Sequence, residues 1–519
     1  MISRRNLAAV AAALAMPCLA RAQAAPTTIR FVPQADLRIL DPVWSTGYIT
    51  RNFAYMVFDT LLARDAAGEI RPQMVEGWEL SADGLSLRFR LRPGLAFHDG
   101  TPVRAVDCIA SIRRWAARDP AGRRLTAATA ALESTSDSDF RFRLAKPFPA
   151  ALSVLSRFSS TPFIMPERLA LTDPSKQVTE AMGSGPFIFK KDEWMPGQRA
   201  VFARNPAYQP RAEAPSGSAG GKVVHVDRVE WMYLPDAATA AAALRTGEID
   251  WLGYPDADLV PEIRTIPGVT VRSIDPYGVV TLGRFNASQP PFNNPLVRQA
   301  AVAAIGRRDT LEAVGGPASE WIACEGPFAC IPGSVAAPQA EADLVLARKL
   351  MAESGYSGQP AVILSSADQS IISLQATVAA ERMKQAGIKI DLQTLDTSSV
   401  QSRRTSREPV ERGGWSMFFT WFAAVDLLDP SSHVALSADG SKGYFGWLDD
   451  PDTERLVDAW FAAAGPDAQA TAKRAIAART RETAPFVISG QFRTPTAFRS
   501  NLVGILEAPV PFFWNVKKT

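Results

Sequence analysis

Residues 78–115 read WELSADGLSLRFRLRPGLAFHDGTPVRAVDCIASIRRW and contain a strand, a tight turn and a helix in direct succession. Apolar and polar side chains alternate strictly over residues 85–91, which predicts a strand with one buried face. Asp99 and Gly100 form a turn dipeptide, and apolar side chains at helical spacing predict a helix over residues 103–117. This stretch alone therefore indicates a chain that mixes strands and helices.

The rest of the chain continues this mixture. Alternation predicts further strands at residues 27–32 and 140–144, and helical spacing predicts helices over residues 237–246, 295–304, 340–354, 373–385 and 452–464. A mixed α/β chain of 519 residues with 47% hydrophobic residues is too long for one core, so two or three domains are expected. Residues 210–221 (PRAEAPSGSAGG) are low in complexity and are expected to form a mobile surface loop.

The first 22 residues have the features of an export signal. A basic head with Arg4 and Arg5 precedes an apolar run over residues 7–20, and Ala20-Arg21-Ala22 has the A-x-A form that signal peptidase requires. Residues 1–22 are therefore predicted to be a signal peptide, with a periplasmic mature chain that begins at Gln23. The arginine pair fits a twin-arginine signal and equally an ordinary basic start, so both export routes stay open.

The charge balance does not indicate a nucleic-acid partner. The formal net charge is +3, and residues 1–22 contain three arginines and no acidic residue, so the predicted mature chain is neutral. A neutral chain without a basic stripe gives no reason to expect nucleic-acid binding.

Three cysteines remain after the predicted cleavage. Cys324 and Cys330 bracket a short Gly/Pro-containing segment, and in an exported protein such a pair favours a loop-closing disulfide over a metal site. Cys108 lies on the apolar face of the helix predicted over residues 103–117 and is expected to be a buried free thiol.

Seven stretches in order resemble one family. Besides residues 78–115, they are GSGPFIF (183–189), ARNPAY (203–208), ALRTGEIDW (243–251), PFNNPLVRQAAVAAI (291–305), ARKLMAESGY (347–356) and TWFAAVDLLDP (420–430). Their types, order and spacing resemble the peptide-type (family 5) extracellular solute-binding proteins of ABC transporters, which include dipeptide, oligopeptide and nickel binders. The resemblance covers nearly all of the predicted mature chain.

The resemblance implies a two-lobed α/β fold of the periplasmic binding protein type, with an extra subdomain in the first lobe. It places residues 23–275 and 490–519 in lobe I, residues 60–182 of these in the extra subdomain, and residues 276–489 in lobe II. The ligand is expected in the cleft between the lobes, whose closure is the signal that the membrane permease recognises. The implied function is that of a monomeric substrate-binding component of an ABC importer, without catalysis, metal or cofactor.

The segment FFTWFAAVDLLDPSSH (418–433) contains two carboxylates in an otherwise apolar run. A buried charge is costly unless something pairs with it. In the relatives that the segment resembles, a carboxylate shortly before a proline receives the α-amino group of a peptide, and Asp426 lies at that offset from Pro430. Asp429 directly precedes the proline and is expected to cap the local turn. The segment has two residues more between Trp421 and Pro430 than the common pattern.

Aromatic and basic residues near this segment are further candidates. Trp415, Trp421 and Trp447 would either offer faces to ligand side chains or belong to the core. Arg404 is a candidate for a ligand carboxylate, with Arg403 and Arg412 as alternatives, or is simply solvated.

The alternative function is an exported hydrolase acting on peptides or esters. The chain has three histidines and lacks the H-E-x-x-H, G-x-S-x-G and C-x-x-C motifs, so the common zinc and serine-nucleophile arrangements have no sequence mark. Among ligands, the resemblance leaves open peptides, opines, glutathione, sugars and metal complexes.

Overall fold

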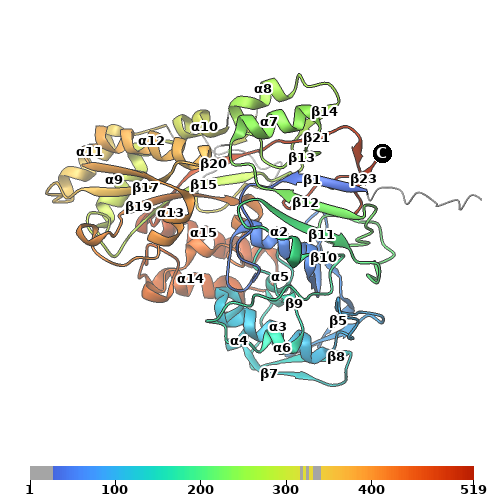
Figure 1. Cartoon of the computed structure of the whole chain (residues 1–519). Coiled ribbons are helices and arrows are strands. Elements are labelled where there is room, and N and C mark those ends of the chain that lie inside the picture. The colour runs from blue at the N-terminus through green and yellow to red at the C-terminus, as the bar shows by residue number, and fades with distance from the viewer. Residues whose placement is uncertain (1–26, 316–319, 323–325, 331–340) are drawn as a thin grey trace, which may run out of the picture.

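The computed structural model describes residues 27–315, 320–322, 326–330 and 341–519. Two large mixed sheets and one smaller antiparallel sheet organise these residues (Figure 1). We call the elements around the seven-stranded sheet the first lobe, those around the six-stranded sheet the second lobe, and those around the four-stranded sheet the subdomain.

The first lobe is built on a seven-stranded sheet. In spatial order its strands are β10 (Phe187–Phe189), β11 (Arg199–Arg204), β12 (Arg228–Met232), β1 (Thr28–Val32), β13 (Trp251–Leu252), β21 (Thr496–Arg499) and β14 (Val269–Arg272). Helix α2 (Tyr48–Val57) packs beside β10, α7 (Ala237–Thr246) beside β13, and α8 (Val260–Ile263) beside β14. Strand β1 runs parallel to both β12 and β13, and its Phe31 meets Trp251 and Phe513 edge-on at 5.2 and 5.1 Å.

The second lobe is built on a six-stranded sheet with helices on both faces (Figure 1). Its strands in spatial order are β16 (Trp321–Ile322), β20 (Phe486–Phe492), β15 (Val279–Phe285), β19 (Met417–Ala423), β17 (Ala361–Ser366) and β18 (Ile390–Leu395). Its helices are α9 (Pro295–Ile305), α10 (Arg307–Gly315), α11 (Leu344–Glu353), α12 (Ser370–Gln385), α13 (Thr397–Arg403), α14 (Pro451–Ala462) and α15 (Pro466–Thr483). All seven residues of β15 are buried, because strands pair on both its edges and helices cover both faces.

The subdomain contains the strand and helix predicted from residues 78–115. Its strands in spatial order are β5 (Val75–Leu80), β6 (Ser86–Leu91), β8 (Asp139–Leu144) and β7 (Thr129–Ser134). Its helices are α3 (Ala105–Arg118), α4 (Pro120–Ala127), α5 (Ala151–Leu155) and α6 (Glu167–Ala170). The apolar positions of the alternating strands face one core, where Phe89 stacks on Phe140 at 5.3 Å.

Three short pairs of strands complete the topology. They are β2 (Asp59–Thr60) with β9 (Phe163–Ile164), β3 (Leu62–Arg64) with β4 (Ile70–Pro72), and β22 (Leu502–Val503) with β23 (Lys517–Lys518). The chain passes between the two large sheets at residues 273–278 and 493–495. Residues 490–492 are the end of β20 and therefore belong to the sheet of the second lobe. At the first crossing Gly278 has φ +73°, and a Cβ there would lie 2.2 Å from the Phe492 carbonyl oxygen, so only glycine fits.

The subdomain also packs on the second lobe. Phe148 stacks on Phe461 of α14 at 5.6 Å, and Arg124 of α4 forms ion pairs with Glu454 and Asp458 of the same helix. One apolar cluster includes buried residues from both units, so the subdomain bridges the two lobes.

The predicted strands at residues 27–32, 85–91 and 140–144 and all six predicted helices are confirmed, most within two residues of their ends. Of the segment predicted as a mobile surface loop, residues 210–216 are exposed or half-buried and lie outside the helices and strands, but for residues 217–221 the prediction is wrong. Residues 217–222 are buried, and a Cβ at Gly217 would lie 2.6 Å from the Arg64 carbonyl oxygen. Glycines here allow close backbone packing, and the next residue, Lys222, is fully buried and bonds to Asp59 at 2.7 Å.

Candidate ligand site between the lobes

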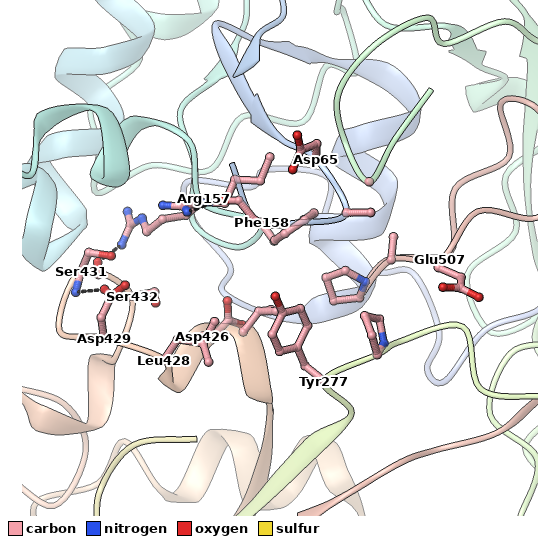
Figure 2. Close-up of a pocket in the computed structure, with 18 residues that line it drawn as sticks. Asp65, Arg157, Phe158, Tyr277, Asp426, Leu428, Asp429, Ser431, Ser432 and Glu507 are labelled. Atoms are coloured by element: carbon pink, nitrogen blue, oxygen red, sulfur yellow. Dashed lines mark hydrogen bonds between the residues drawn. The ribbon is translucent and has the colours of Figure 1, made fainter. Parts of the chain in front are cut away.

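A cavity of about 60 Å³ lies between the lobes (Figure 2). The first lobe and the subdomain contribute residues 64–66, 68, 157, 158, 217 and 507–509. The second lobe contributes residues 425, 426, 428, 429, 431 and 432, and the crossing segment contributes Pro276 and Tyr277. Arg157 and Phe158 face Asp426 and Tyr277 across this space in Figure 2. The small volume shows that the two lobes lie close together here.

Asp426 lines this cavity from a short 3-10 helix, Ala424–Leu427, that directly follows β19. The residue is only 6% exposed. Its Oδ2 accepts a hydrogen bond of 2.9 Å from the hydroxyl of Tyr48, and it makes no ion pair within the part of the chain that the structure describes. Burial raises the pKa of its carboxyl group, and the positive charge of Arg51 opposes that rise. The carboxylate is therefore held in a site that does not fully compensate its charge.

Tyr48 connects Asp426 to Trp421. Tyr48 is the first residue of α2 in the first lobe, and its hydroxyl also accepts a 2.7 Å hydrogen bond from the backbone N–H of Ala423. Its ring stacks on Trp421, with centroids 5.0 Å apart, and the Arg51 guanidinium lies 4.4 Å from its centroid. The ring of Tyr254, also in the first lobe, lies beside the Trp421 ring, with the two centroids 6.2 Å apart. Asp426 and Trp421, predicted as ligand contacts, are thus brought together.

Arg51 is a buried cation with neutral partners. It is 5% exposed, and its N–H groups donate to Asn52 Oδ1, Ser159 Oγ and the Pro509 carbonyl at 3.0 to 3.1 Å. Nearby, burial raises the pKa of Asp275 to about 6. The site thus contains the buried guanidinium of Arg51, that of the cavity-lining Arg64, whose pKa burial lowers, and the carboxylates of Asp426 and Asp275. With three further carboxylates in the cavity wall, this arrangement suits a ligand with its own cationic group.

The outer part of the cavity is polar. Asp65, Asp429 and Glu507 supply further carboxylates, whereas Arg157 is paired with Asp119 at 2.8 Å and donates to the Ser431 carbonyl at 2.6 Å. Asp429 accepts a 2.8 Å hydrogen bond from the Ser431 backbone N–H, so its predicted role as a turn cap is confirmed.

Of the five predicted ligand contacts, only Asp426 lines the cavity. Trp421 packs on Tyr48 instead, and the other three lie within the second lobe. Trp415 is fully buried and Trp447 is 7% exposed, and both belong to an apolar cluster inside the second lobe. The indole N–H of Trp415 donates to the Ser406 carbonyl within that lobe. Arg404 lies over Phe445 and Phe418, 4.7 and 5.6 Å from their centroids, at the edge of the same cluster. For Trp415 and Trp447 the core alternative describes the geometry, because their large aromatic side chains fill the space under the sheet. Arg404 is half-buried at the edge of that cluster.

Sequence reasoning missed Tyr48, Arg51, Tyr254 and Asp275. Tyr48 is separated from Asp426 by 378 positions, and no local pattern around it differs from an ordinary helix start. Only the three-dimensional arrangement of the lobes brings these residues together.

No hydrolytic arrangement is visible in the described residues. The His98 and His433 rings contact backbone carbonyls, of Gly185 and Pro327, and no described histidine bonds to a serine, a cysteine or a carboxylate. The same residues contain no group of three or more metal-ligating side chains. Cys108 is a buried free thiol as predicted, whereas Cys324 lies outside the described residues, so its bridge to Cys330 stays a prediction.

No helix within the described ranges has the length and apolar character needed to cross a membrane.

Comparisons with known proteins agree with this architecture. The probable peptide ABC transporter periplasmic-binding protein y4tO of Sinorhizobium fredii is 36% identical over 535 residues, covering 100% of this chain and 99% of that protein. The periplasmic binding protein AgaA of Agrobacterium tumefaciens R10, solved with agropinic acid, and DppA of Helicobacter pylori, solved with the peptide STSA, each superpose with a TM-score of 0.79 at 21% identity. Both alignments cover 95% of this chain, with 99% of the first structure and 98% of the second, and they show the two-lobed fold.

The family model for the middle region of the bacterial extracellular solute-binding proteins, family 5, matches residues 69–444. That match includes the subdomain, the first crossing between the lobes and the Asp426 segment. With the relative that aligns over its whole length, it establishes that this chain belongs to the family 5 bacterial extracellular solute-binding proteins.

Proposed function

We propose that the protein is the periplasmic substrate-binding component of an ABC importer and that it captures a short peptide or a related amine-bearing solute between its lobes. The printed function of the y4tO relative supports the peptide class and the transporter. The protein releases its ligand chemically unchanged to a membrane permease and works as a monomer without a cofactor.

The observation that carries this proposal is the environment of Asp426. Its carboxylate is buried against the inter-lobe cavity, it makes no ion pair in the described part of the chain, and its pKa is raised. A ligand ammonium group would supply the missing positive charge and hydrogen-bond donors. Asp65 and Glu507 in the cavity wall then face the remainder of the ligand, whereas Asp429 accepts the Ser431 N–H and caps the local turn.

Closure of the lobes follows from the same geometry. Both lobes contribute cavity residues, so a ligand in this position contacts both at once and favours the closed state over the open one. The closed surface is what a permease can distinguish from the empty, open protein.

The proposal includes export of the protein with cleavage of its signal peptide. Removal of residues 1–22 would release a chain that begins at Gln23 into the periplasm, an oxidising compartment in which Cys324 and Cys330 can form their predicted disulfide.

The test compares matched peptides. The protein is titrated calorimetrically with trialanine, N-acetyl-trialanine and trialanine amide. The masses of the recovered peptides are then measured by mass spectrometry. We expect trialanine to bind and to be recovered intact, acetylation to weaken binding strongly because it removes the ammonium charge, and amidation to have a smaller effect. A saturating ligand at 100 times its Kd should stabilise the protein by about 2.7 kcal/mol. Cleaved peptide would favour the hydrolase, and equal affinities for the free and acetylated peptides would exclude an amine anchor.

A further inference from the structure

Tyr48 makes two hydrogen bonds across the lobe interface with one hydroxyl group. It belongs to α2 of the first lobe, and its partners, the Ala423 N–H and the Asp426 carboxylate, belong to the second. The N–H donates to the hydroxyl oxygen at 2.7 Å, and the hydroxyl donates to Asp426 Oδ2 at 2.9 Å. A phenol has one donor and can accept at the same time, so both bonds coexist.

The aromatic ring of Tyr48 is also held in place by contacts that do not involve its hydroxyl. It stacks on Trp421 with an angle of 27° between the ring planes, and the Arg51 guanidinium lies 4.4 Å from its centroid. Burial and the nearby Asp426 raise the pKa of Tyr48 well above its ordinary value, so the hydroxyl remains a donor throughout the physiological pH range.

Separation of the lobes breaks both bonds together. Ala423 is the last residue of β19, and its N–H and the carboxylate of Asp426 would then have to bind water instead. When the lobes close, the hydroxyl fixes one carboxylate oxygen and thereby the orientation of the whole group toward the cavity.

From this geometry we infer that Tyr48 is a positioning residue that links lobe closure to the orientation of the Asp426 carboxylate. The inference rests on the proposed function and deepens it, because it names the contact through which the ligand anchor and the closed state depend on each other. Tyr48 acts through Asp426 and Trp421, so its removal is expected to weaken binding and to shift the lobes toward the open state.

The same helix offers a matched control. Tyr55 also lies in α2 and is also buried, but its hydroxyl donates to the Phe158 carbonyl at 3.0 Å, and Phe158 lies on the same side of the cleft as α2. Tyr55→Phe therefore removes a buried hydroxyl contact of comparable length without touching the second lobe.

The experiment measures closure directly. Fluorescent labels at Val345→Cys on α11 and Val503→Cys on β22 report the distance between the lobes, since both positions are exposed and Cys108 is buried. Energy transfer is recorded with and without trialanine for the wild-type, Tyr48→Phe and Tyr55→Phe proteins, and trialanine affinity is titrated for each.

We expect Tyr48→Phe to reduce the closed fraction and to lower trialanine affinity by roughly tenfold or more, as for a lost hydrogen bond to a charged group. Tyr55→Phe should lower the melting temperature while changing affinity and closure by less than about twofold. The inference is overturned if Tyr48→Phe changes neither quantity more than Tyr55→Phe does. If trialanine binds none of the proteins, the peptide assignment fails; a closed fraction reduced only in Tyr48→Phe would then still support the inference.

Discussion

Asp426→Asn separates the role of the charge from the role of the fold. Asparagine keeps the shape of the side chain and an oxygen that can accept the hydrogen bond from Tyr48 Oη, so the local structure should persist. Only the negative charge is removed from the cavity wall.

The magnitude follows from the contact that the charge would make. An ammonium about 3 Å from the carboxylate, at an effective dielectric constant near 20, gains roughly 5 kcal/mol of Coulomb energy. Desolvation of both ions consumes part of it, which leaves an expected loss of about 2 to 4 kcal/mol in Asp426→Asn, or roughly 30- to 1000-fold in Kd. The ligand-free protein should be as stable as the wild type or more stable, because burial already disfavours the charged form of Asp426.

A double-mutant cycle isolates this charge contact. Wild-type and Asp426→Asn proteins are each titrated with trialanine and N-acetyl-trialanine, and acetylation should cost the wild type several kcal/mol but the variant little, roughly 1 kcal/mol or less. Asp429→Asn is the matched control, since Asp429 lines the same cavity but caps the turn at Ser431, and its affinity should stay near that of the wild type. An equal penalty for acetylation in both proteins, or an unchanged Kd in Asp426→Asn, would refute the assignment of Asp426 as the amine anchor.

Three further predictions concern stability and processing. Burial raises the pKa of Asp275 to about 6, so the unfolded chain loses this proton at a lower pH than the folded protein does. The free energy of unfolding of the wild type should therefore fall by up to about 3 kcal/mol relative to Asp275→Asn as the pH rises from about 4 to about 6. The same dependence of melting temperature on pH in both proteins would contradict this. Thiol titration of the denatured, unreduced mature protein should find one free group, Cys108, whereas three would disprove the bridge between Cys324 and Cys330. The intact mass of exported protein should correspond to a chain that begins at Gln23, and retention of any earlier residue would show a different cleavage site.

Most of the fold could be predicted because its signals are local. The alternation over residues 85–91 and the helical spacing over residues 103–117 report which side of each element is buried, and β6 and α3 follow within two residues. Residues 217–221 are wrongly predicted to lie in a mobile surface loop, because glycines permit both a mobile loop and close backbone packing.

The site was predictable only in part for a related physical reason. Asp426 is a polar residue in an apolar run, and that contrast is visible in the sequence. Trp421 and Trp415 have the same side chain and lie six positions apart, yet one contacts Tyr48 and the other is fully buried in the second lobe. Strand orientation and distant partners decide between them, and neither is encoded within a short window.

The position of β21 between β13 and β14 has a consequence for the timing of folding. About 220 residues separate the end of β14 from the start of β21, and they include every described strand of the second lobe. At roughly 5 to 20 residues per second, a ribosome needs on the order of 10 to 45 s to make that stretch. Throughout this interval β13 and β14 have no partner strand between them, and the edge of the first sheet remains open. The first lobe can therefore complete its sheet only after almost the whole chain has been made, so its folding is tied to the last stage of synthesis.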